Sequence, residues 1–288
     1  MTEAELAAVR RAYAMQVLAG VGVTNARLEA AYAAVRREDF CGPGPWQIFR
    51  FGQAYMPTPA ADPVYLYTDD LVGLVPERRI NNGQPSLHAH LLNQAGVEPG
   101  EHIVHIGTGA GYYTAIMAEL VGPEGKVTGI EFDEGLAGRA RENLAGRANV
   151  EIVRGDGTVA EFAPADVIYV NAGATRPADI WLDRLKAGGR LILPLTTDTS
   201  FGVASQSPAE ASRLGAVFRI TRKGEGFDAK WISAVAIFPC EGGRDAASER
   251  ALFAAFEKGP PRGVTRLLRR DATDSDNAWL SAPGWCLA

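Results

Sequence analysis

The stretch HIVHIGTGAGYYTAIMAELV, residues 102–121, decides the fold of this 288-residue chain. It opens with a short, mostly apolar run that is typical of a buried strand. Alternate glycines follow at Gly107, Gly109 and Gly111, and the apolar residues Tyr112–Val121 then predict a helix. A strand that passes through a glycine turn into a helix is typical of the first unit of an open α/β sheet.

Predicted strands and helices alternate outward from this stretch. A helix is expected before it, over Leu87–Ala95. After it we expect strands at 126–131, 150–153, 166–170 and 190–193, with helices between them and a turn at 186–189. Alternation of this kind predicts a parallel sheet with helices on both faces. Segments 214–218 and 231–238 look like strands joined without long helices, which predicts an antiparallel edge. The predicted fold class is therefore α/β, with a Rossmann-like, mostly parallel sheet.

The chain is expected to divide into three parts. Residues 1–76 comprise N-terminal helices, the second capped by Thr24, and an irregular segment at 42–75. We expect this segment to cover the carboxyl ends of the strands and shape the acceptor pocket, because its aromatic residues would be poorly solvated as a linker. These residues are Trp46, Phe49, Phe51, Tyr55, Tyr65 and Tyr67. Residues 77–240 are expected to form the cofactor-binding domain, and 241–288 a C-terminal extension with a helix at 246–256.

The amino-acid composition limits the classes of protein to which the chain can belong. Hydrophobic residues make up 47% of the chain and charged residues 22%, which is typical of a soluble globular enzyme. The net charge of −5 argues against general electrostatic binding of nucleic acid. Cys41, Cys240 and Cys286 form no Cys-x-x-Cys pair, which fits a reducing compartment. Because we find neither a signal peptide nor an apolar run long enough for a membrane span, a cytoplasmic protein is expected. The sequence does not indicate an oligomeric state.

The glycine loop predicts a cofactor site. Glycines allow the chain to pass close under a ligand, and free N–H groups at the following helix favour a negative group such as a carboxylate. A dinucleotide-binding loop would need its third glycine at position 112, where the chain has Tyr112. A P-loop would need a Lys-Ser/Thr pair, which does not follow. The candidate loop residues are Gly107, Thr108, Gly109 and Gly111.

Acidic residues follow the next two predicted strands. Glu131 ends the second strand, where a carboxylate can accept both ribose hydroxyls of an adenosine. Its alternative role is to cap the next helix, for which Asp133 is better placed. Asp156, followed by Gly157, comes just after the third strand, where it can accept the amine of adenine; an ordinary Asp-Gly turn is the open alternative. A glycine loop, a ribose acid and an adenine acid in this order predict S-adenosylmethionine as cofactor, and a class I methyltransferase.

The sequence resembles the protein-L-isoaspartate O-methyltransferase family over most of its length. The motifs that carry the resemblance lie at 21–40, 80–84, 106–112, 155–157, 167–174, 185–194 and 238–240. The resemblance implies a Rossmann-like sheet with an N-terminal helical addition, and methyl transfer from S-adenosylmethionine to the free carboxylate of abnormal aspartyl residues in proteins or peptides. It also implies that Asn171 contributes to the cofactor site.

The chain departs from the family pattern on the acceptor side. The family usually continues Gly-Gln with Thr-Ile-Ser, whereas this chain has Pro85-Ser86-Leu87 after Gly83-Gln84. On the strand before the loop, His105 stands where the family usually has an acid. Ser86 and His105 are the candidate catalytic residues. We predict weak or absent transfer to standard isoaspartyl peptides, with cofactor binding retained. The alternatives are another peptide or small-molecule acceptor, or a cofactor-binding homologue without activity.

The acceptor chemistry explains why no catalytic triad is expected. A carboxylate, with an ordinary pKa of about 4, is ionised at neutral pH and needs no base to attack a sulfonium methyl. A hydroxyl acceptor would need one, and His88, His90 or His105 could supply it; the alternative for His88 and His90 is that one packs and the other faces solvent. His88 and His90 share no helical face, so no metal site is expected.

Overall fold

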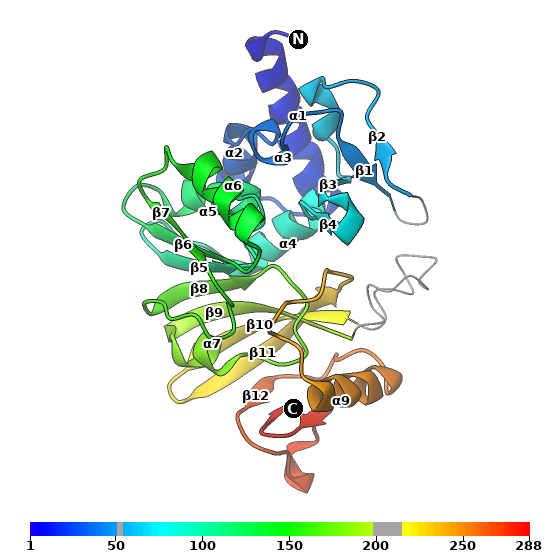
Figure 1. Cartoon of the computed structure of the whole chain (residues 1–288). Helices are drawn as coiled ribbons and strands as arrows, with labels where there is room; N and C mark the ends of the chain where they lie inside the picture. The colour runs from blue at the N-terminus through cyan, green and yellow to red at the C-terminus, as the bar shows by residue number, and fades with distance from the viewer. Residues whose placement is uncertain (51–53, 198–214) are drawn as a thin grey trace. The chain divides into compact units, whose positions relative to one another are not determined.

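The computed structural model describes residues 1–50, 54–197 and 215–288 (Figure 1). The chain forms two compact units. Unit 1 comprises residues 1–101 and 108–154, and unit 2 comprises residues 102–107 and 155–288. The glycine loop therefore begins in unit 2 and continues into unit 1. The predicted three-part division at residues 76 and 240 stays a prediction.

Helices form the N-terminal part of unit 1. These are α1 (Glu3–Gly20), α2 (Ala26–Ala34) and α3 (Glu38–Cys41). Asn25, not the predicted Thr24, caps α2, because its side chain accepts a hydrogen bond from the Leu28 N–H. Helix α2 packs against both α4 (Pro85–Ala95) and α5 (Tyr112–Val121). The N-terminal helices thus contact the two helices that carry the acceptor motif and follow the glycine loop.

The segment predicted to be irregular, 42–75, contributes to a small antiparallel sheet. Its strand order is β2-β1-β3-β4, with β1 at Gln47–Phe49, β2 at Met56–Pro57, β3 at Leu71–Val75 and β4 at Ile80–Asn81. The 3₁₀ helices η1 (Pro63–Leu66) and η2 (Pro76–Arg78) interrupt it. The expectation of an irregular segment is wrong because strands of two to five residues are too short to show an alternating pattern.

The predicted aromatic packing in this segment holds in part. Trp46 and Tyr67 are buried, whereas Tyr65 is exposed. Phe51 lies outside the described residues. A core cluster of Cys41, Trp46, Leu66 and Val72 holds the segment together.

A βαβ unit completes unit 1. Strands β6 (Lys126–Glu131) and β7 (Val150–Arg154) pair in parallel, and α6 (Glu134–Leu144) connects them. The side chain of Asp133 caps α6, as expected. Glu131, at the carboxyl end of β6, is thereby left available for another role.

Unit 2 contains the rest of the mixed sheet. Its strand order is β13-β14-β12-β11-β10-β9-β8-β5. Strands β5 (His102–Ile106), β8 (Ala165–Val170) and β9 (Leu185–Thr196) pair in parallel. Strands β10 (Gly215–Lys223) and β11 (Gly226–Ala234) continue the sheet in antiparallel fashion, which confirms the predicted edge. Leu214, predicted to begin β10, lies outside the described residues. The predicted α/β fold class is confirmed.

The turn predicted at 186–189 is instead part of β9. Leu185 already pairs with Ala165, and the register resumes at Arg190 opposite Val167. The intervening residues therefore form a bulge within the ladder, not a turn before the strand. Helix α7 (Asp179–Asp183) precedes this bulge.

The C-terminal extension adds strands to the sheet. Helix α9 (Ala246–Glu257) is followed by β12 (Arg266–Leu268), η5 (Asp274–Asp276), β13 (Leu280–Ala282) and β14 (Trp285–Leu287). Strand β12 pairs with β11. Arg244 Nη1 donates to the carbonyl oxygens of Gly173 and Thr196, at 3.0 and 2.9 Å. These bonds attach the start of the extension to the end of β9.

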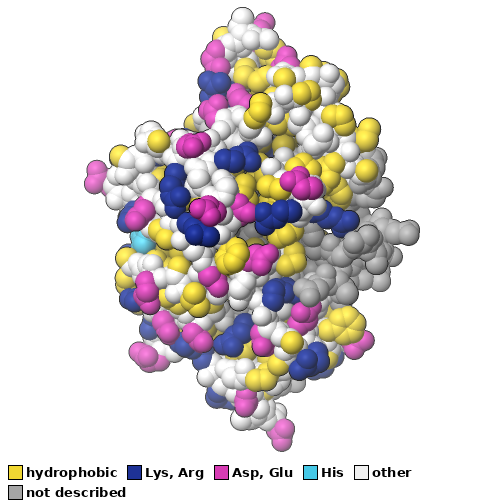
Figure 2. Space-filling model, viewed as in Figure 1, with side chains coloured by type: hydrophobic (Ala, Val, Ile, Leu, Met, Phe, Trp, Pro, Cys, Tyr) yellow, Lys and Arg dark blue, Asp and Glu magenta, His cyan; other side chains and the backbone are white. Residues whose placement is uncertain are grey.

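The surface carries a mixture of charges. On the face drawn in Figure 2, Lys and Arg side chains are interspersed with Asp and Glu. None of the helices in the described ranges is long and apolar enough to cross a membrane.

Candidate active site

Glu131 bonds to the glycine loop at the carboxyl end of β6. Its Oε2 accepts the Gly109 N–H at 2.7 Å, and its Oε1 accepts the Asp133 N–H at 3.0 Å. The side chain is buried, and this burial raises the pKa of Glu131, while the two backbone hydrogen bonds oppose the rise. A carboxylate oxygen can accept more than one hydrogen bond, so Glu131 can hold the loop and still accept from ribose hydroxyls.

The loop in unit 1 has the conformation that its glycines permit. Gly109 has φ +59° and Gly111 has φ +101°. A Cβ on Gly111 would lie 2.7 Å from Leu144 Cδ1, so α6 allows no side chain there. A Cβ on Gly109 would meet only Leu74 Cδ1, at 3.6 Å. Gly109 therefore presents its backbone to a more open space, which Leu74 of β3 borders. Thr108, within the loop, is buried, and its N–H donates to Ile130 O at 3.4 Å.

Phe132 is a candidate cofactor residue that sequence reasoning missed. It directly follows Glu131, yet 49% of it is exposed. A large exposed aromatic ring beside the ribose acid offers an apolar face that an adenine ring could cover. Its position, next to a predicted ribose-binding acid, was the sequence signal that could have identified it.

In unit 2, Asn171 binds the first loop glycine. Its Nδ2 donates to Gly107 O at 3.2 Å, and its N–H donates to Ile106 O at 2.8 Å. Gly107 has φ +77°, and a Cβ there would lie 3.4 Å from Asn171 O. Asn171 thus supports the loop from the end of β8.

Asp156 and Gly157 form a tight turn in unit 2. Asp156 Oδ1 accepts both the N–H and the hydroxyl of Thr158, at 2.8 and 2.7 Å. A Cβ on Gly157 would lie 2.4 Å from Ile106 Cγ2, so the turn packs directly on β5. A Cβ on Gly242 would lie 2.3 Å from Asp156 Oδ2. The Asp-Gly turn expected as the alternative is present, and the C-terminal extension reaches the Asp156 carboxylate.

His105 is enclosed within β5. The side chain is fully buried, and its ring meets that of Tyr169 edge-on, with centroids 5.7 Å apart. Burial lowers the pKa of His105 to about 3, so the ring is neutral at physiological pH. This environment favours a packing role over acid–base chemistry.

Ser86 meets a carboxylate that the sequence did not connect to it. Ser86 Oγ donates to Asp69 Oδ2 at 2.6 Å, and Ser86 N–H donates to Asp69 Oδ1 at 2.7 Å. Gln84 Nε2 also donates to Asp69 Oδ2, at 2.8 Å. Since Gln84 provides no side-chain cap of its own, Asp69 caps α4 from a distant part of the chain. No sequence pattern linked Asp69 to this motif.

The acceptor motif packs beside the helix that follows the glycine loop. Tyr113, in the first turn of α5, donates its hydroxyl to Gly83 O at 3.1 Å. His88 stacks on the Tyr113 ring at 3.8 Å and is buried, which supports the packing alternative for this histidine. Burial lowers the pKa of His90. No group of three potential metal-ligating side chains occurs among residues 1–50, 54–197 and 215–288.

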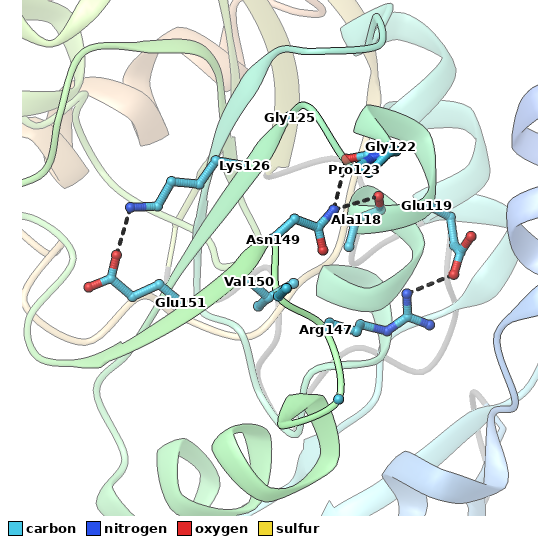
Figure 3. Close-up of a pocket in the computed structure, with 12 residues that line it drawn as sticks. Ala118, Glu119, Gly122, Pro123, Gly125, Lys126, Arg147, Asn149, Val150 and Glu151 are labelled. Carbon is cyan, nitrogen blue, oxygen red and sulfur yellow. Dashed lines mark hydrogen bonds and ion pairs between the residues drawn. The ribbon is translucent and has the colours of Figure 1, made fainter.

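A broad pocket of about 830 Å³ lies at the other end of β6 and β7 (Figure 3). Its charged side chains are paired: Lys126 with Glu151 at 2.8 Å, and Arg147 with Glu119 at 2.7 Å. Asn149 donates to the carbonyl oxygens that end α5. Because the pocket is at the amino ends of the parallel strands, it is not the cofactor site.

Comparison with known proteins agrees with this geometry. Residues 52–212 match the model of the protein-L-isoaspartate(D-aspartate) O-methyltransferase family. A protein-L-isoaspartate O-methyltransferase of Ignicoccus hospitalis is 36% identical over 159 residues, covering 54% of this chain and 69% of that protein. The Thermotoga maritima enzyme of the same name is 37% identical over 128 residues, covering 43% of this chain and 40% of that protein.

Solved structures give the same result. A protein-L-isoaspartate O-methyltransferase structure superposes with a TM-score of 0.62 and 26% identity, covering 80% of this chain and 65% of that one. A Plasmodium falciparum protein described as a putative member of the same class, in complex with S-adenosyl-L-homocysteine, gives a TM-score of 0.60 at 18% identity, with coverages of 80% and 97%. The latter likeness shows the fold alone.

The fold and the loop-bound acid define an S-adenosylmethionine-dependent methyltransferase. The family model covers more than half of the chain. The chain therefore belongs to the protein-L-isoaspartate(D-aspartate) O-methyltransferase family, whose members act on proteins that contain isoaspartyl residues.

Proposed function

We propose that the protein transfers the methyl group of S-adenosylmethionine to a carboxylate oxygen of a protein or peptide. The observation that carries this proposal is the hydrogen bond between buried Glu131 and Gly109 N–H. This bond supports a role for Glu131 in accepting from ribose, because it holds the carboxylate against a loop that can approach a ligand closely.

The residues present fit the cofactor. Gly109 leaves an open approach, Glu131 offers its remaining lone pairs, and the exposed ring of Phe132 lies next to it in sequence. Gly107, Asn171, Asp156 and Gly157, all in unit 2, are further proposed cofactor residues. When bound, S-adenosylmethionine supplies an electrophilic methyl group on a sulfonium centre.

The protein has to align the acceptor and exclude water. An ionised carboxylate is already nucleophilic, so the barrier is lowered by orienting its oxygen in line with the methyl–sulfur bond. The first turn of α4, with Ser86, is proposed to hold the acceptor, because Tyr113 joins this region to the start of α5.

A carboxylate acceptor agrees better with the histidines than a hydroxyl does. A hydroxyl needs a base whose pKa is near the operating pH. The pKa of His105 is about 3, and burial also lowers that of His90. His105 is therefore a weak base, and its proposed influence on the acceptor is through packing and shape.

Two measurements test the proposal in sequence. Titration calorimetry with S-adenosylhomocysteine should show binding that is lost in Gly109→Val. Gly122→Val is the matched control, since Gly122 also has a positive φ, of +68°, with nothing within 4 Å of its Cβ position. Labelled methyl transfer to an isoaspartyl peptide, which we predict to be weak or absent, and to other peptide carboxylates then tests the carboxylate acceptor. Equal cofactor affinity in both variants, or base-labile label absent from every carboxylate tested, contradicts the proposal.

A further inference from the structure

The acceptor segment, which we define as residues 83–87, is bonded to the helix that follows the glycine loop. Tyr113 donates its hydroxyl to Gly83 O at 3.1 Å. Tyr113 is buried and lies in the first turn of α5, two residues after Gly111, the N-cap of that helix. The main chain of the acceptor segment is therefore attached directly to the start of α5.

The acceptor segment is packed tightly against Tyr113. The ring of His88, in the first turn of α4, stacks on the Tyr113 ring with centroids 3.8 Å apart and an interplanar angle of 26°. Gly83 has φ +79°, and a Cβ there would lie 2.4 Å from His88 Nε2 and 3.3 Å from Tyr113 Cε2. Because even a methyl group has no room, the segment cannot shift toward α5 unless the Tyr113 ring moves.

A second tyrosine connects the start of α5 to the same segment. Tyr32 of α2 donates its hydroxyl to Pro85 O at 3.0 Å. Its ring meets that of Tyr112 edge-on, with centroids 6.5 Å apart, and Tyr112 is the first residue of α5. All three tyrosines, Tyr32, Tyr112 and Tyr113, are buried. The start of α5 thus contacts the acceptor segment directly through Tyr113 and indirectly through Tyr112 and Tyr32.

The start of α5 also belongs to the proposed cofactor site. Gly111 caps α5 without a side chain, and N–H groups at the beginning of a helix favour a negative group on a ligand. A ligand bound there restrains the first turn of α5 and, with it, the Tyr113 ring. Binding that orders one site lowers the entropic cost of ordering a second site in contact with it. Cofactor binding should therefore order the acceptor segment.

We propose that Tyr113 is a positioning residue that couples cofactor binding to the order of the acceptor segment. This inference rests on the proposed function, in which the glycine loop binds S-adenosylmethionine and Ser86 lies beside the acceptor. Tyr113 acts through the main chain at Gly83 and takes no part in the transfer of the methyl group.

The experiment measures amide hydrogen exchange in residues 83–87 with and without saturating S-adenosylhomocysteine. In wild type the ligand should slow exchange about fivefold, the effect expected of one hydrogen bond. In Tyr113→Phe, which keeps the ring and removes the hydroxyl, the ratio of the two exchange rates should fall to about one. Tyr13→Phe is the matched control. It also removes a buried tyrosine hydroxyl, which lies 3.4 Å from that of Tyr112, and should keep the wild-type ratio.

The ratio of exchange rates separates positioning from support of the fold. A tyrosine that only supports the fold would, when replaced, speed exchange by the same factor with and without S-adenosylhomocysteine, which leaves the ratio unchanged. If Tyr113→Phe does not fold, as judged by its melting temperature, His88→Leu takes its place. This variant removes the ring that stacks on Tyr113 and should reduce the ratio in the same way.

Titration calorimetry distinguishes this inference from the proposed function. Failure of the wild type to bind S-adenosylhomocysteine would contradict the proposed function and the inference together. Binding that leaves exchange in residues 83–87 unchanged would overturn the inference alone, and so would a wild-type ratio in Tyr113→Phe. A wild-type response that is lost in Tyr113→Phe and kept in Tyr13→Phe supports the inference, whichever carboxylate proves to be the acceptor.

Discussion

Glu131 Oε2 lies 2.7 Å from Gly109 N, so the acid at the end of β6 is hydrogen-bonded to the glycine loop. The acid and the loop are proposed to bind the same cofactor. The acid is held before any ribose arrives, and little side-chain entropy remains to be lost on binding. Two of the three features that predicted the cofactor from sequence, the glycine loop at Gly109 and the acid Glu131, are therefore connected within unit 1.

Replacing Glu131 should weaken cofactor binding in a pH-dependent way. In Glu131→Ala, lost ribose hydrogen bonds should cost roughly 1.5–3 kcal/mol of binding free energy. Because burial raises the pKa of Glu131, its protonation begins at a higher pH than for an ordinary glutamate. Wild-type affinity for S-adenosylhomocysteine should therefore fall as pH is lowered through that raised pKa, and calorimetry at several pH values measures this. Glu134→Ala is the control, and an equal loss of affinity there would contradict the role of Glu131.

A methyl group on Gly242 should disturb Asp156, the proposed adenine-binding residue. In Gly242→Ala the new Cβ would lie 2.3 Å from Asp156 Oδ2, so Asp156 or the 241–244 loop must move. We expect weaker S-adenosylhomocysteine binding by calorimetry. Gly224→Ala is matched to it, since Gly224 has φ +56° and nothing within 4 Å of its Cβ position. If both variants lose stability alike and neither loses affinity, Asp156 does not contact the cofactor.

His105 should make the protein less stable in mild acid. Its pKa falls from an ordinary value near 6.5 to about 3 on folding, so below pH 6.5 the unfolded chain binds a proton that the folded chain does not. Stability is therefore lost as pH falls from about 6.5 toward 3, by about 2 kcal/mol at pH 5. His105→Gln should remove this contribution, as measured by urea unfolding at pH 7 and pH 5. A constant difference between wild type and variant at the two pH values would show that His105 does not titrate in this way.

Replacing Arg37 should lower the free energy of unfolding far more than replacing its neighbour Arg36. Arg37→Met leaves the carbonyl oxygens of residues 66, 68 and 70 without their donor, which should cost about 3 kcal/mol or more of unfolding free energy. Arg36→Met removes an exposed side chain that pairs with exposed Glu3 and Asp39 and with the largely buried Glu38, at 3.3 Å, and should cost less, about 1 kcal/mol. Chemical denaturation compares the two. Equal losses would mean that the 66–70 turn does not depend on Arg37.

Local sequence patterns were sufficient to predict the strands and the helix on either side of the glycine loop. Strand β5, helix α5 and strand β6 have the bounds predicted from periodicity and glycine punctuation. Strand β5 is a mostly apolar run that ends before Gly107, α5 ends before Gly122, and β6 begins directly after Gly125. The order of the loop, Glu131 and Asp156 was readable for the same reason, because each follows a recognisable strand.

Contacts between distant residues decided the rest. Strands β1–β4 have too few residues to show a pattern, and they form because Ile48 pairs with both Met56 and Val72. Asp69 lies 17 residues from Ser86 in the sequence, and only the turn held by Arg37 brings them together. A hydrogen bond between residues so far apart produces no periodic pattern in the sequence, because it forms only when the surrounding elements of unit 1 have packed together. The amino-acid sequence alone thus determined the fold class and the cofactor, whereas tertiary structure decided which side chains surround Ser86 and the turn at 66–70.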